Sequence, residues 1–219
     1  MTVLLFLLFP VVLLLNSCGS GSVALVKTQE EIDYFLEIAF GAEYGESEAR
    51  VLKWNTDIRI QVFGDPSPED LASLSGVILE LNNLIQKPKL TIVPQDPNIT
   101  IHFLPENRFM EAEPNYVPIN FGFFWTSWHD DNLELYSANI LIAVDQISQS
   151  ERSHLIREEL TQSLGLMNDS NKYKTSIFFT GWTETQKYSE IDKKVIRTLY
   201  SQNVKSGMTI PEILKHLQD

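Results

Sequence analysis

The chain has 219 residues, a net charge of -12 and a sequence pI near 4.7. Hydrophobic residues make up 43% of it and charged residues 21%, which is typical of a globular protein with one substantial core and excludes a disordered chain. The acidic excess also argues against a nucleic-acid-binding protein, because binding to phosphates requires a basic surface.

The N-terminus predicts export. Residues 3 to 15 form an almost unbroken apolar run that ends in Leu15-Asn16-Ser17-Cys18. The run is too short for an ordinary membrane span and has the length of a signal-peptide hydrophobic core. Cys18 is the only cysteine, so an intramolecular disulfide is excluded. We expect a signal peptide at residues 1–17, a tether at 18–27 and one domain at 28–219.

Residues 15–18 resemble the bacterial lipobox, in which the cysteine is acylated and becomes the mature N-terminus. This resemblance implies that Cys18 carries lipid and anchors the protein to a membrane of the cell envelope. Gly19 in place of Asp resembles Gram-negative lipoproteins of the outer membrane, with the domain facing the periplasm. No Lys or Arg precedes the apolar run, unlike an ordinary signal peptide. The alternatives are an uncleaved anchor helix and an unmodified cysteine.

The first half of the domain shows both helical and strand periodicity. Thr28 to Glu31 has the pattern of a capping box and predicts a helix that ends at Gly41. Alternation predicts a strand at 58–63, and a second helix should follow the Pro66 to Pro68 break and close before Pro88. Two short strands are predicted at residues 90–93 and 99–103.

Residues 104–120 are rich in Pro and Asn and predict a long surface loop. The apolar stretches at 121–128 and 138–144 then predict a pair of strands. Ser148 to Glu151 is a second capping-box pattern and starts a helix at about 149–165. The segment from Ile191 to Tyr200 resembles the final helix of matrixins.

The helix at about 149–165 carries a polar stripe. Placing residues at intervals of about 100° puts Ile156, Leu160, Ser163 and Leu164 on one arc, and Glu158, Glu159 and Gln162 on another. From spacing alone, the plain interpretation is an amphipathic helix whose polar face is solvated and whose C-cap is Gly165.

The stretch from Glu158 to Asp169 resembles the H-E-x-x-H-x-x-G-x-x-H signature of metzincin-type zinc peptidases. Glu159 and Gly165 occupy the positions of the catalytic Glu and the Gly. Glu158, Gln162 and Asn168 occupy the positions of the three zinc-binding His. The resemblance covers residues 53 to 217 and implies an α+β, zincin-like fold in which a mixed sheet packs on helices. It also implies a role for Glu159 as general base.

Three segments resemble, more closely, an uncharacterised family of bacterial lipoproteins within that superfamily: 157–162, 165–170 and 207–209. That resemblance implies a fold and a location but no activity.

The donor set at the three His positions is poor for zinc. Gln162 and Asn168 offer only neutral amide oxygens, which suit a hard cation such as calcium or magnesium better than zinc. Without a strong Lewis acid, the pKa of an attacking water stays at about 15.7 rather than about 7. The sequence therefore predicts no metal cofactor and favours binding over proteolysis. The alternative is an active metallopeptidase that binds zinc or a hard divalent cation through oxygen-rich coordination.

Other chemistries have less support. A glycosidase needs two carboxyl groups about 5 to 10 Å apart across a cleft, and the adjacent Glu158 and Glu159 diverge around the helix, although Asp169 is near in sequence. His102, His129 and His154 are expected to be packing or surface residues. The binding hypothesis is a cleft that accepts a peptide or envelope polymer by strand addition, and its lining or glycan-contacting residues are expected among Phe121, Phe123, Phe124, Trp125 and Trp128.

Overall fold

The computed structural model describes residues 24–40, 50–114, 116–118 and 120–217. The expected signal peptide, Cys18 and most of the tether lie outside these residues. Among the helices of the described ranges, none combines the length and the apolar character needed to cross a membrane.

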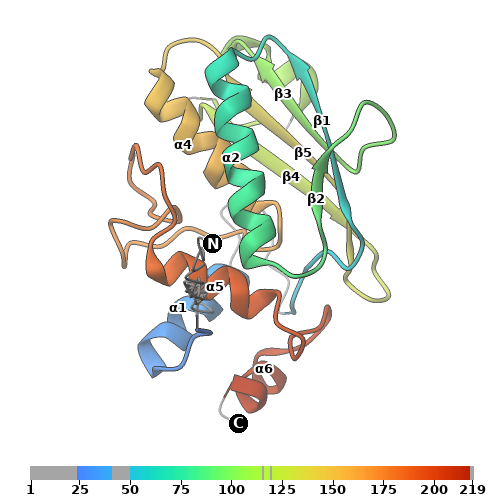
Figure 1. The fold of residues 1–219 in the computed structure, drawn as a ribbon, viewed down its shortest axis with the longest axis vertical. Helices are drawn as coiled ribbons and strands as arrows, with labels where there is room; N and C mark the ends of the chain where they lie inside the picture. Colours follow the sequence, from blue (N-terminus) through green and yellow to red (C-terminus); the bar gives the residue numbers. More distant parts are fainter. Residues whose placement is uncertain (1–23, 41–49, 115, 119, 218–219) are drawn as a thin grey trace, which may run out of the picture.

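A five-stranded mixed sheet forms the centre of the molecule (Figure 1). Its strands are β1 (Ile58–Gly64), β2 (Leu90–Ile92), β3 (Ile99–Leu104), β4 (Gly122–Trp128) and β5 (Leu135–Ala143), in the order β2-β1-β3-β5-β4. The first four strands in this order are parallel, and β4 pairs with β5 antiparallel, with Phe124 opposite Ile140. Strand β4 is therefore an edge strand.

Helices cover the sheet and extend the molecule beyond it. The helices are α1 (Gln29–Phe40), α2 (Pro68–Leu84), α3 (Phe109–Ala112), α4 (Gln149–Gln162), α5 (Glu190–Leu199) and α6 (Ile210–Leu217). Helices α2 and α4 run side by side over the sheet, and α1, α5 and α6 form a second group below it (Figure 1). The predicted α+β class is confirmed.

Capping boxes fix where three of these helices begin. Ser67, Ser148 and Ser189 each accept a bond from the backbone three residues later, and the acidic side chain there bonds back. Helix α4 ends at Gln162, three residues before the predicted end. Gly165 instead lies in the following turn with φ of 105°, and a Cβ atom there would lie 2.1 Å from the Leu52 carbonyl oxygen.

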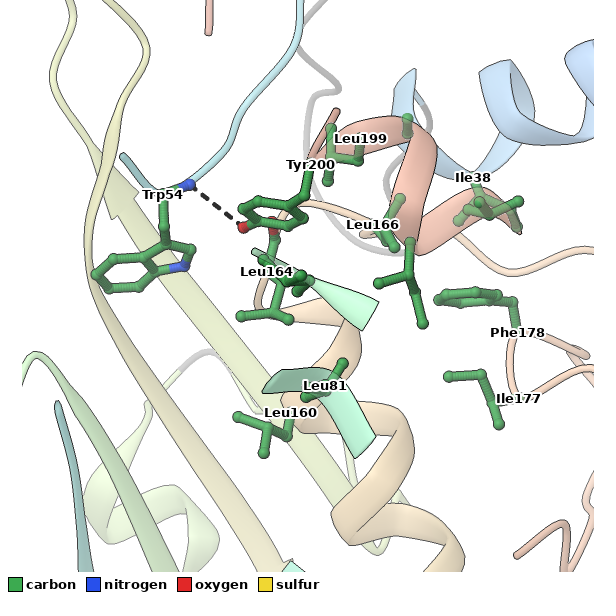
Figure 2. Close-up of a cluster of buried hydrophobic side chains, with 14 of the residues drawn as sticks. Ile38, Trp54, Leu81, Leu160, Leu164, Leu166, Ile177, Phe178, Leu199 and Tyr200 are labelled. Carbon is green, nitrogen blue, oxygen red and sulfur yellow. Dashed lines mark hydrogen bonds between the residues drawn. The ribbon is translucent and has the colours of Figure 1, made fainter. Parts of the chain in front are cut away.

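The end of α4 is held by the main core (Figure 2). The Trp54 indole N–H donates to the Ser163 carbonyl at 3.0 Å, and the Tyr200 hydroxyl donates to the Leu164 carbonyl at 2.8 Å. The Trp54 backbone N–H in turn donates to the Tyr200 hydroxyl, the dashed line in Figure 2. Carbonyls that a helix end leaves without intrahelical partners are thus satisfied by buried side chains.

The prediction of a surface loop at residues 104–120 is wrong. The segment contains a 3-10 turn at Glu106–Arg108 followed directly by α3, and Phe109 is fully buried. Phe109 packs edge-on against Tyr116, which packs edge-on against Phe123 of β4. These aromatic contacts form a second small core on the other face of the sheet. Burial of the aromatic rings overrides the turn-forming composition of the segment.

Candidate functional site

A small pocket of about 120 Å³ lies where β4, α4 and the segment 179–183 meet. The start of β4 supplies one wall, the C-terminal half of α4 supplies the floor, and Phe179 to Thr183 supply the opposite wall. The charged groups in the lining are His154, Glu158, Glu159 and Asp169. The pocket therefore combines aromatic walls with an acidic floor.

The polar stripe of α4 faces this pocket and not bulk water. Glu159 is 7% exposed and Gln162 is 2% exposed, and the Glu158 side chain is 13% exposed. The solvated amphipathic interpretation of the helix is therefore wrong. Buried carboxylates and amides need polar partners, so the contacts around them decide what the pocket can do.

Glu159 lies directly beneath β4, at Gly122. A Cβ atom added to Gly122 would lie 2.3 Å from Glu159 Oε1. Real Cβ contacts are never that short, so the strand can approach the carboxylate only because this residue has no side chain. The candidate general base is thus packed against the sheet edge.

Glu158 pairs with His154, one turn earlier on the same helix. His154 Nε2 lies 3.3 Å from Glu158 Oε2, and His154 Nδ1 donates to the Thr185 carbonyl at 3.0 Å. Burial lowers the pKa of His154, but the hydrogen bond and the charge of Glu158, with the Thr185 carbonyl, outweigh it and raise the pKa above its ordinary value. The pairing with Glu158 therefore stabilises the protonated form of His154 relative to a buried imidazole without such a partner.

Gln162 and Asn168 point to different places. Gln162 Nε2 donates to Asp169 Oδ1 at 2.7 Å within the pocket. Asn168 Nδ2 instead donates to the Glu37 carbonyl of α1 and to the Asp169 carbonyl, and its backbone N–H donates to Ile38. Asn168 is not among the residues that line the pocket, and Asp169 takes the place beside Gln162.

A buried carboxylate, Asp192, fixes the turn that precedes the wall at 179–183. Asp192 accepts hydrogen bonds from the Ser176 hydroxyl and from the backbone N–H groups of Ile177 and Ser189. Burial raises the pKa of Asp192, although these hydrogen bonds oppose the effect. Ser170 N–H donates to the Phe178 carbonyl and Thr180 N–H donates to Ser170, so the wall is also tied to the chain that follows α4.

Aromatic side chains form the rim. Phe121 packs edge-on against Trp182, which is 58% exposed and donates its indole N–H to Glu151 at 2.6 Å. Of the five aromatic residues predicted to line a cleft, Phe121, Phe123 and Phe124 line the pocket. Trp125 packs in the second core and Trp128 packs against the main core.

The three positions equivalent to zinc ligands do not converge. Glu158 is paired with His154, the Gln162 amide donates to Asp169, and the Asn168 amide points at α1. Within residues 24–40, 50–114, 116–118 and 120–217, no three of His, Cys, Asp and Glu are grouped so that they could hold a metal ion. A neutral amide offers zinc only a weakly binding oxygen, and the three side chains are held by different partners, so these residues do not fit zinc.

Sequence reasoning missed part of this pocket. His154 was expected to be a packing or surface residue, and nothing pointed to Trp182 or Thr183. One signal was present: His154 and Glu158 are four residues apart, the spacing at which helix side chains meet. His102, by contrast, lies outside the pocket and stacks on Phe63.

Comparison with known proteins places the chain in a family. No curated protein matches it. Two solved structures of myroilysin are similar, both at 14% identity. One has a TM-score of 0.45 over 69% of this chain and 97% of the other, and the second has a TM-score of 0.32 over 85% and 79%. Residues 28–219 match the family described as protein of unknown function (DUF2927). The chain belongs to this family.

Proposed function

We propose that this protein is a lipid-anchored protein of the bacterial cell envelope that binds an extended peptide along β4 and does not cleave it. The observation that carries the proposal is the pocket at an open sheet edge, with buried carboxylates beneath the strand. The scaffold is a zincin-like one, and the sequence resemblance to metzincins supports this assignment.

The edge of β4 offers backbone groups for strand addition. The Ala143 N–H donates to the Phe121 carbonyl, so Phe121, and by alternation Phe123 and Trp125, direct their backbone groups toward β5. The N–H and C=O groups of Gly122, Phe124 and Thr126 then point the other way. In the described part of the chain no strand pairs with that side of β4. An extended peptide can bind there through main-chain hydrogen bonds.

The pocket beside this edge favours a cationic side chain. A bound strand directs alternate side chains to either face of the sheet, and those on the α4 side would meet Glu158, Glu159 and Asp169. The His154 imidazole pairs with one of these carboxylates, Glu158. A Lys or Arg side chain therefore complements the acidic lining, and the rings of Phe121 and Trp182 would cover its aliphatic part.

Binding is favoured over hydrolysis by the chemistry of the groups that stand in place of the zinc ligands. Two of the three are amides, and Asn168 is held by α1 rather than by the pocket. Glu158 is paired with His154, and the Gln162 amide is engaged by Asp169. We therefore regard the site as a metallopeptidase-like site that has lost its zinc-binding residues.

Three capped peptides that differ only at a central Lys, norleucine or Glu test the proposal by calorimetry at low salt. We expect affinity to decrease in that order, and added salt should weaken the Lys peptide most. Equal affinities would contradict the acidic pocket.

A matched pair of variants tests strand addition. Thr126→Pro removes a backbone donor on the open edge, whereas Thr126→Val keeps it, and both lose the Thr126 contact with Met167. We expect Thr126→Pro to weaken the Lys peptide about fivefold relative to Thr126→Val, because one main-chain hydrogen bond contributes about 1 kcal/mol. Identical affinities would exclude binding along β4. Peptide cleavage that requires bound zinc and is lost in Glu159→Gln would establish the metallopeptidase instead.

The anchor requires its own test. We expect metabolic labelling with a fatty acid to mark the chain and Cys18→Ser to abolish the label. Unlabelled wild-type protein in the envelope would exclude lipidation at Cys18.

A further inference from the structure

Two adjoining pockets lie away from the peptide site, where α5 ends, and the larger one also includes residues of α6. Their volumes are about 640 and 520 Å³, and they share Gln86, Tyr200, Ser201 and Gln202. The basic residues that line them, which we call the basic face, are Lys27, Lys53, Lys87, Arg197, Lys205 and His216. Neither lining includes an Asp or Glu, although the protein has a net charge of -12.

The positive charge of the basic face is not neutralised locally. Within the described ranges, Lys27, Lys87, Arg197 and Lys205 form no ion pair. Glu31 pairs with Lys194, Glu134 accepts from Asn55, and Glu212 accepts from Thr209. Among the described residues of the basic face, only His216 lies near enough to Glu212 for their charges to interact. Burial, and then the charge of Lys205, lower the pKa of Lys53 to about 8. A nearby positive charge disfavours protonation of a lysine, so the charge of Lys205 lowers the pKa of Lys53.

The position of the basic face along the chain suggests what covers it. Ala24 and Leu25, the first described residues, line the larger pocket. Cys18 precedes Ala24 by six positions, and six residues span at most about 20 Å. A lipid attached at Cys18 would therefore keep the basic face close to the bilayer surface. Basic residues near an anionic leaflet are attracted to it, and the attraction acts over about one Debye length.

We propose that the basic face docks on anionic phospholipid headgroups, so that the protein lies against the membrane with Lys87, Arg197 and Lys205 at the phosphates. Only the distance to the bilayer rests on the proposed anchor at Cys18. The charge pattern is independent of that anchor. Docking in this orientation turns α6 to the membrane, and α4 lies in the opposite half of the molecule (Figure 1).

The test uses the full chain in vesicles of phosphatidylcholine, alone or mixed equally with phosphatidylglycerol. A fluorophore on Gln202→Cys, an exposed position shared by both pockets, reports its distance from a quencher carried on lipid headgroups. We expect stronger quenching in the anionic vesicles and a loss of that difference at high salt. Equal quenching in both kinds of vesicle would overturn the proposal.

A charge-matched pair of variants makes the test specific. Lys87→Glu/Lys205→Glu reverses two exposed residues of the basic face, and Lys174→Glu/Lys187→Glu reverses two exposed residues that line neither pocket. Each lysine lost from the basic face should reduce docking about fivefold, whereas the control pair should dock like wild type. Equal losses in both would show a general charge effect and overturn the proposal. Lys87→Gln/Lys205→Gln removes the two charges without reversing them, so we expect an intermediate loss of docking. This variant keeps the test valid if the reversed variant misfolds.

Two further outcomes distinguish free phosphate from phospholipid, and the proposed anchor at Cys18 from docking by the basic face. Inorganic phosphate that binds the protein in solution, with no effect of phosphatidylglycerol, would overturn membrane docking in favour of a free-phosphate site. If wild-type protein isolated from cells carries no acyl lipid, the anchor is refuted. If its binding to anionic vesicles still requires Lys87 and Lys205, docking by the basic face is supported.

Discussion

At the scale of single residues, Gly122 controls the contact between the sheet edge and the site helix. We expect Gly122→Ala to lower the free energy of unfolding by about 1 to 3 kcal/mol, because the new Cβ atom overlaps Glu159 Oε1 and forces the strand or the carboxylate to move. Denaturant unfolding measures the loss.

Gly76 provides the matched control, because a Cβ atom there meets nothing within 4 Å and the residue lies inside α2. Gly76→Ala should raise stability by about 0.5 to 1 kcal/mol through its better helix propensity. Similar effects of both substitutions would contradict the close approach at Gly122.

The His154–Glu158 pair gives a titration signature. In Glu158→Gln, burial is no longer opposed by the carboxylate, so the pKa of His154 should fall from above its ordinary value to below it. Because the folded pKa is raised in wild type, the stabilisation by the pair is complete below about pH 6.5 and is lost as pH rises through the folded pKa. NMR titration of the His154 ring checks the direction, and Glu190→Gln, an exposed change elsewhere, should leave the ring unaffected. An unchanged His154 titration in Glu158→Gln would refute the pairing.

At the scale of elements, Lys53 joins the chain before β1 to the end of α5. Its ammonium donates to the Leu199 and Val204 carbonyls at 2.9 Å, and only 7% of the residue is exposed. Burial lowers its pKa to about 8, so the unfolded chain binds more protons between pH 8 and about 10.4, and stability should rise with pH in this window.

Comparison with Lys53→Met isolates this contribution from that of the tyrosines. The free energy of unfolding of wild type should gain on the order of 3 kcal/mol or less relative to the variant between pH 8 and about 10. Parallel pH profiles would show that Lys53 titrates normally.

Local sequence patterns predict most of the helices and strands, but they do not predict how the site residues are arranged. The strands at Ile58 and Ile99 and the helix capped by Ser148 lie close to their predicted bounds, because alternation, helical period and capping are properties of neighbouring residues. Glu158, Glu159 and Gln162 share a face for the same reason. The direction of Asn168 depends on the turn at Gly165 and on α1, and the buried Phe109 depends on Tyr116 and β4. Such contacts join distant segments and leave no periodic signal.

At the scale of the whole molecule, Glu158 and Gln162, two of the three residues at the zinc-ligand positions, contact other side chains of the pocket. We therefore expect a chelator to leave the melting temperature unchanged, because no bound ion contributes to the folded state. Differential scanning calorimetry with and without chelator measures this. A fall of several degrees that is reversed by zinc would show that metal stabilises the fold.

The first described residues have a mechanical relation to α5. The Val26 N–H donates to Thr198 Oγ1 near the end of α5, and the first turn of the same helix contains Asp192, which holds the turn at Ser176 and Ile177. Tension applied at Val26 would therefore act on α5 through this hydrogen bond and on α1 through the chain itself, so these two packed helices would share the load.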